Sequence, residues 1–166
     1  MERLLKKEEK IFDVMKNCFR SFGLKILDEA KTNNQLMLFS KFEYKNYNFG
    51  ITAIYHPDGD LVEISTVYAN IPKDKIKPVS ELMNHINSII VSGHFYVVYA
   101  TGVMSFSTAV HVIDSLNKDD FEWALDQVMS LNYKFFPMVI ELIFTDRQPL
   151  DIIKSQLENE PMEVHS

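Results

Sequence analysis

The sequence predicts an α+β domain built on a single antiparallel sheet. Hydrophobic residues make up 46% of the 166 residues, which is enough for a packed core. The strand-like segments follow one another through turns of about two residues, which only antiparallel neighbours permit. Segments with helical periodicity stand before, between and after the strand groups. The expected order of elements is therefore α-βββ-α-ββ-α.

The first element is predicted to be a helix over residues 4–22. Ile11, Met15 and Phe19 recur there at helical spacing, and Gly23 is a suitable stop. One face of this helix should therefore pack on the sheet.

Three strands are expected next, over residues 36–44, 47–56 and 61–69. Lys45-Asn46 and Asp58-Gly59 are the turn residues between them. Asp-Gly favours a hairpin because glycine adopts positive φ at no steric cost. These strands should form an antiparallel meander.

A second helix and a second hairpin are expected in the middle of the chain. Residues 76–90 have helical periodicity, and Pro78 is tolerated because it falls in the first turn. Residues 95–100 and 103–112 then form strands around Thr101-Gly102. The second group of strands should therefore also be antiparallel.

A long helix should close the domain, with Asn117 as its N-cap. Pro137 lies inside its apolar pattern and is expected to kink or break it near Phe136. Residues 149–157 could add a short helix. Residues 158–166 are polar and should be frayed.

Two-residue turns would fix which residues face each other. Ile51 would lie opposite Ser40 on one side and Thr66 on the other, and Val97 would lie opposite Phe106. Each hairpin then has one mostly apolar face, which should be buried against helices.

The opposite face of these strands is less polar than a solvated face normally is. Two explanations remain open: a helix covers part of it, or it is an exposed patch that binds a partner. For the second case, the expected partner-binding residues are Met37, Phe39, Ile54 and Leu61. The second hairpin adds Tyr96, Val98 and Val103 to this face.

The polar side of the middle helix is almost uncharged. Ser80, Asn84, His85 and Asn87 lie on it, and Glu81 carries its charge. Interface cores are depleted in charge, so this side could be a dimer interface. Plain exposure to solvent is the alternative.

Composition excludes several classes of function. The net charge is −6 and basic residues do not cluster, so nucleic acid is not expected as a partner. The chain lacks a run of about 18 apolar residues, so we expect no membrane span. Cys18 is the only cysteine and cannot form an internal disulfide. The cytoplasm is the expected compartment.

Candidate metal sites are weak. In the expected register His94 and His111 are diagonal neighbours, but a third ligand is missing. Acidic residues around the first sharp turn depart from the spacing of a calcium-binding EF-hand, and turn formation explains them better. This turn group is His56, Asp58, Asp60 and Glu63.

Catalytic and cofactor motifs are also lacking. Phosphate-binding glycine loops, zinc-protease motifs and nucleophile elbows do not occur. Cys18 lies beside Phe19 on the first helix and is best explained as a small core residue, and Trp123 is also expected in the core. We therefore expect neither an enzyme nor a cofactor.

The segment over residues 49–143 resembles the YbjN family of bacterial proteins, described as sensory transduction regulators. The residues that carry the likeness are the paired strands over 51–68, the helix Val79-Ser80-Glu81-Leu82-Met83-Asn84-His85-Ile86-Asn87, and the strand entry Gly93-His94-Phe95. Residues 121–136, followed by a proline, are similar to the closing helix of the family. The order of elements also resembles the type III secretion chaperone fold.

This resemblance implies a non-enzymatic, chaperone-like domain, often a homodimer, that offers its sheet and helix surfaces to a protein partner. It brings no catalytic residue. We expect one domain over residues 1–145, followed by a short helix and polar tail over 146–166. A small-molecule-binding sensor domain is the alternative, and a closed pocket ringed by polar groups would favour it.

Overall fold

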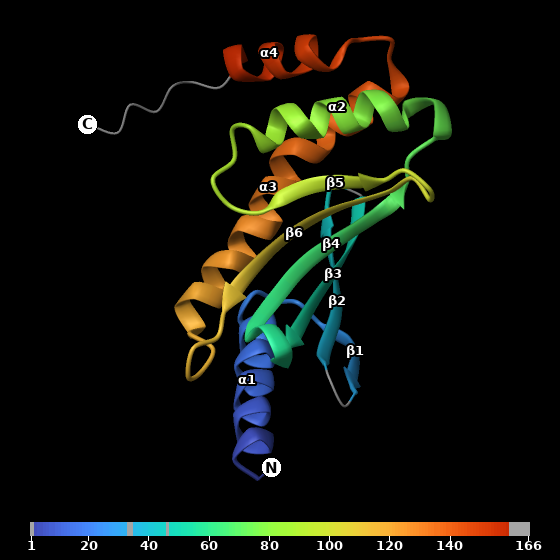
Figure 1. The fold of residues 1–166 in the computed structure, drawn as a ribbon. Coiled ribbons are helices and arrows are strands. Elements are labelled where there is room, and N and C mark those ends of the chain that lie inside the picture. Colours follow the sequence, from blue (N-terminus) through green and yellow to red (C-terminus); the bar gives the residue numbers. More distant parts are fainter. Residues whose placement is uncertain (1, 33–34, 46, 160–166) are drawn as a thin grey trace, which may run out of the picture.

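The computed structural model describes residues 2–32, 35–45 and 47–159. Its centre is one six-stranded sheet in the order β1-β2-β3-β4-β6-β5, and every neighbouring pair is antiparallel (Figure 1). The predicted α+β class with a single antiparallel sheet is confirmed. The strands are β1 (Ile26–Lys31), β2 (Leu36–Tyr44), β3 (Tyr47–His56), β4 (Leu61–Asn70), β5 (His94–Val98) and β6 (Val103–His111). The helices are α1 (Glu2–Ser21), α2 (Ile76–Asn87), α3 (Lys118–Phe144) and α4 (Pro149–Asn159), with short 3-10 turns η1 (Pro57–Gly59) and η2 (Lys73–Lys75).

Strand β1 was not expected from the sequence. It lies at the edge of the sheet and pairs only with β2 among the described strands. Leu27, Asp28 and Glu29 are exposed in succession, and the register shifts between Ile26 and Asp28. An edge strand with a bulge lacks the regular alternation by which strands are recognised.

The registers predicted for the first two hairpins are confirmed. Ile51 lies opposite Ser40 in β2 and opposite Thr66 in β4. The second turn is wider than two residues, because η1 fills it and Asp60, not Gly59, adopts the positive φ of 44°.

The predicted register of the β5–β6 hairpin is wrong by two residues. Val97 lies opposite Met104, not Phe106. The backbone N–H of Gly102 donates to the carbonyl of Val98 at 2.7 Å, so the loop contains four residues and not two. A shift of two leaves each side chain on its predicted face. It does, however, place His94 opposite Ser107, so the expected pair of His94 and His111 does not form.

Helix α3 is continuous through Pro137, so of the expected kink or break near Phe136 the break does not occur. Phe135, Met138 and Val139 flank the proline and are buried, and this packing offsets the lost backbone hydrogen bond. The predicted cap is confirmed, because the Asn117 side chain accepts from the backbone N–H of Asp119 at 2.9 Å.

The expectation that Trp123 lies in the core is wrong. Its side chain is 53% exposed on the outer side of α3, so it does not belong to the core. Its neighbour Ala124 is buried instead, because consecutive helical residues point about 100° apart.

Among the described residues, none of the helices has both the length and the apolar character that crossing a membrane requires.

Helices α1 and α3 pack on one face of the sheet, which we call the covered face (Figure 1). Ile64 of β4 and Phe106 of β6 are completely buried there. Two polar side chains of this core, Thr66 and Asn132, bond to each other at 3.2 Å, and this bond joins β4 to α3. Helix α2 contacts β5 at the sheet edge and α4 packs against α2.

Candidate functional site: the open face of the sheet

The second face of the sheet carries the four residues that the sequence predicts for partner binding. Met37 lies directly opposite Ile54, and Leu61 lies on the next strand, opposite His56. All of them, with Phe39, are partly exposed, whereas their neighbours along each strand are buried. Within the described residues, α1 and α3 pack on the other face, so we call this one the open face.

Phe39 forms an apolar surface together with a glycine. A Cβ atom at Gly50 would lie 3.2 Å from the Phe39 ring, so the ring covers the space that a side chain would otherwise fill. Gly50 is paired with Val67 of β4, which is 47% exposed. Apolar surface therefore continues from β2 across β3 to β4.

The open face continues across the second hairpin, as the sequence predicts. Val98 and Val103 lie opposite each other, and Tyr96 shares their face. Val98 is 41% exposed and Tyr96 is 37% exposed. Single exposed apolar side chains are common, but a series that crosses the sheet is typical of an interaction surface.

A row of polar side chains crosses the lower part of this face. Gln35 Nε2 lies 3.2 Å from His56 Nδ1, and His56 Nε2 lies 3.4 Å from Glu63 Oε2. The second contact is an ion-pair distance without hydrogen-bond geometry. The Ser107 hydroxyl donates to Glu63 Oε1 at 2.8 Å. Each contact joins a different pair of chain segments, so the row holds Glu63 in a defined position.

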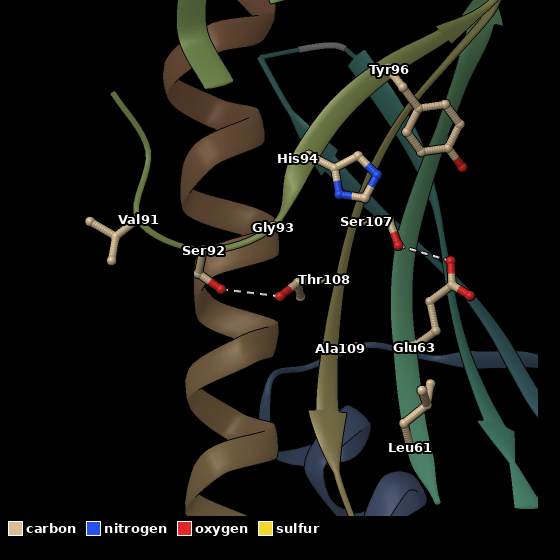
Figure 2. A pocket seen from close by; sticks show the side chains of 10 residues that line it. All are labelled: Leu61, Glu63, Val91, Ser92, Gly93, His94, Tyr96, Ser107, Thr108 and Ala109. Atoms are coloured by element: carbon tan, nitrogen blue, oxygen red, sulfur yellow. Dashed lines mark hydrogen bonds between the residues drawn. The ribbon is translucent and has the colours of Figure 1, made fainter. Parts of the chain in front are cut away.

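The row ends in a hollow of about 710 Å³ between β4, β6 and the segment that leads into β5 (Figure 2). His94, Ser107 and Glu63 lie side by side in it. Its lining consists of Leu61, Glu63, Val91, Ser92, Gly93, His94, Tyr96, Ser107, Thr108 and Ala109.

The polar groups of the hollow are joined by hydrogen bonds. Ser107 donates its hydroxyl proton to the Glu63 carboxylate at 2.8 Å. The part of the chain that the structure describes contains no group of three His, Cys, Asp or Glu side chains that could hold a metal ion. Among the described residues that line the hollow, Glu63 is the only Asp, Glu, Lys or Arg.

The turn group predicted around residues 56–63 separates into two parts. Asp60 turns toward α1, where Lys7 binds it at 2.8 Å and Tyr55 donates to it at 3.0 Å. These two donors hold the pKa of Asp60 below its ordinary value. Glu63 turns instead to the open face. Sequence spacing could not find its role, because Ser107 comes from a strand 44 residues away.

The four residues proposed for a dimer interface lie on α2, at a distance from the polar row. Asn84 is exposed and His85 is partly exposed, while Ser80 donates to the Ile76 carbonyl. Asn87 is used within the chain: its amide donates to the carbonyl of Phe95 and accepts from the same residue's N–H, both at 2.8 Å. Asn87 therefore fixes α2 to β5.

Cys18 is completely buried on α1. Burial raises the pKa of its thiol, and together with the nearby Glu122 carboxylate it brings this pKa to about 11. The thiol therefore remains protonated at neutral pH, as a structural cysteine would.

Comparison with known proteins identifies the relatives of this fold. The model of a family described as "YbjN: Putative bacterial sensory transduction regulator" matches residues 20–141. This confirms the resemblance seen in the sequence. None of the curated proteins gives a significant match.

Two solved structures share the fold. One is a chain of the ExsC–ExsE complex, with a TM-score of 0.58 and 13% identity over 79% of this chain and 94% of that one. The other is YbjN from E. coli, described as "a putative transcription regulator", with a TM-score of 0.51 and 10% identity over 76% and 91% of the two chains. They confirm the expected type III secretion chaperone-like fold.

Proposed function

Because the chain belongs to the YbjN family, we propose that it is a non-catalytic regulator that binds another protein through the open face of its sheet. The observation that carries this proposal is the apolar series across that face. Met37, Phe39, Ile54 and Leu61 are partly exposed there, and helices pack on the other side.

Burial of these side chains is a sufficient source of binding energy. A Leu, Ile, Phe or Met side chain that goes from exposed to buried contributes about 1.5–3 kcal/mol, from which the cost of association is subtracted. These four are already partly buried, so each contributes less than the full amount. Methionine adds adaptability, because its unbranched thioether packs against varied surfaces.

The structural neighbours support a partner that is itself a protein. One similar chain comes from a complex between two proteins, ExsC and ExsE. At 13% identity this likeness shows the fold alone, so the binding mode is our extension of it to this chain.

We also propose that the protein forms a homodimer through the polar side of α2. Ser80, Asn84 and His85 are the contact residues in this proposal, and Asn87 keeps the helix at its place on β5. A polar face whose charge comes from Glu81 alone among the side-chain set Ser80, Glu81, Asn84, His85 and Asn87 matches the depletion of charge found at interface cores.

The small-molecule sensor alternative has one feature in its favour, the hollow of about 710 Å³. Ligand pockets of that size normally enclose most of the ligand. This hollow is open and merges with the apolar series, which favours a macromolecular partner.

The test replaces Phe39 by aspartate. Phe39→Asp should abolish capture of the partner that co-purifies with the tagged chain from its native host, because a charge would be buried in the interface. Its melting temperature should stay close to that of the unmodified protein. Phe144 is 80% exposed at the end of α3, so Phe144→Asp is the matched control and should retain both properties.

Two results would contradict the proposal. If Phe39→Asp captures the partner as well as the unmodified protein does, the open face is not the binding surface. A large fall in melting temperature would show that Phe39 belongs to the core, and the surface would have to be abandoned.

A further inference from the structure

The hollow beside Glu63 has a defined charge, and from it we propose what it binds: a lysine or arginine side chain of the protein partner, with the Glu63 carboxylate as its counter-ion. This inference rests on the proposed function, because it names the part of the partner that enters one end of the open face.

A glycine creates the hollow. Gly93 has a φ of 72°, and a Cβ atom at this position would lie 2.7 Å from the carbonyl oxygen of Ser107. Only glycine allows the chain to approach β6 so closely and then turn away. Strand β5 therefore pairs with β6 only as far as Ser107, while β6 continues to His111. The end of β6 is left without a neighbouring strand on this side among the described residues, and the hollow lies there.

Glu63 is already positioned for a cation. Ser107 fixes one carboxylate oxygen by donating to it at 2.8 Å, and 35% of the side chain remains exposed. In the other ion pairs between described residues the cation is lysine or arginine, as in Lys7 with Asp60 and Lys16 with Glu29. In the described residues the only basic side chain within ion-pair distance of Glu63 is His56.

The walls of the hollow suit the rest of a long basic side chain. The rings of His94 and Tyr96 lie 5.5 Å apart at an angle of 31°, next to the carboxylate (Figure 2). Aromatic faces attract cations, and Leu61 offers apolar contact for the methylene groups. An acidic partner side chain is disfavoured, because it would meet the Glu63 carboxylate and the described lining residues include no lysine or arginine to offset it.

The probe is a short apolar peptide with one central arginine, acetyl-Leu-Val-Arg-Val-Leu-amide. Its matched control contains citrulline, which has nearly the same shape as arginine but no charge. Binding is followed by amide chemical shifts of the full-length protein labelled with ¹⁵N. The arginine peptide should shift the amides of Ser107 and Ala109, and the citrulline peptide should bind about tenfold more weakly.

Glu63→Gln then tests the counter-ion. Its amide oxygen can still accept from Ser107, so the fold should be retained and the dispersed amide spectrum will verify it. This variant should bind the two peptides equally. Glu81→Gln is the control, because Glu81 is exposed on α2 outside the hollow, and it should keep the preference for arginine.

The inference is overturned if the unmodified protein binds both peptides equally, if Glu63→Gln still prefers arginine, or if the arginine peptide does not bind. It is also overturned if acetyl-arginine-amide binds as tightly as the whole peptide, because the site would then serve a free small cation. If both peptides bind equally and Phe39→Asp abolishes both, the inference fails while the proposed function stands. Retained partner capture by Phe39→Asp is instead a failure of the proposed function.

Discussion

The two faces of the sheet are built by alternate residues of the same strands, yet helices α1 and α3 cover only one of them. On β3, Ile51, Ala53 and Tyr55 are at most 2% exposed on the covered face. Their neighbours Thr52 and Ile54 are partly exposed on the open face. Both sets contain apolar side chains, so composition alone does not separate core from surface. The difference comes from α1 and α3, which cover one side.

Polar groups follow the same division. On the covered face Thr66 and Asn132 are completely buried. Thr66 donates to Asn132, whose amide donates to the Val128 carbonyl, so both are satisfied within the fold. On the open face the polar row leads to Glu63, whose side chain stays partly exposed. A polar group that the fold satisfies internally is structural, whereas one that stays partly exposed is available to a partner.

The largest expected effect is a loss of folding stability, which should be much greater for a substitution on the covered face than for one on the open face. Phe106 is completely buried and packs on Phe95 with ring centroids 4.7 Å apart. Phe106→Ala should lower the free energy of unfolding by about 3–5 kcal/mol, because it leaves a cavity. Phe39→Ala on the open face should cost about 1 kcal/mol. Urea denaturation measures both, and equal losses would remove the distinction between the faces.

A smaller loss of stability is expected on α2, where Asn87 is bonded within the fold and Asn84 is exposed. Asn87→Ala removes both hydrogen bonds to Phe95 and should lower the free energy of unfolding by about 1–3 kcal/mol in urea denaturation. Asn84 is exposed, and Asn84→Ala should change it by less than about 0.5 kcal/mol.

A variant on helix α2 tests the proposed homodimer. Light scattering of the unmodified protein should yield twice the chain mass of 19.3 kDa. Asn84→Arg should yield the single chain mass while its amide spectrum stays dispersed and native, because a charge would be placed in the interface. A monomer at high concentration in the unmodified protein would refute the dimer.

The last prediction concerns Cys18, on the covered side of the sheet. Cys18→Ala should lower the free energy of unfolding by about 1 kcal/mol and leave partner capture unchanged. With a pKa of about 11, the native thiol should react with iodoacetamide far more slowly than the denatured chain at pH 8. Fast reaction in the native state, or loss of capture without loss of stability, would mean that Cys18 belongs to a functional surface.

Local patterns in the sequence determined much of this protein. Alternation and turn residues predicted the registers around Ile51, and Asn117 was identified as a cap from its position before the acidic first turn. These features depend on residues that are close along the chain. Strand alternation also separates the two faces, because it alone predicts that Met37, Phe39, Ile54 and Leu61 share one of them.

Contacts between distant segments decided the rest. The β5–β6 register depends on a four-residue loop whose Gly102 carbonyl accepts from the backbone of Ile71, far along the chain. The sequence places Glu63 near a turn, and only the pairing of β6 in the sheet brings Ser107 beside it. Gly93 likewise shapes the hollow because Phe106 and Ser107, which are distant from Glu63 along the chain, lie against it. Alternation reveals that a strand has two faces, but the side on which helices pack is set by the path of the whole chain, and that path determined which face stayed open.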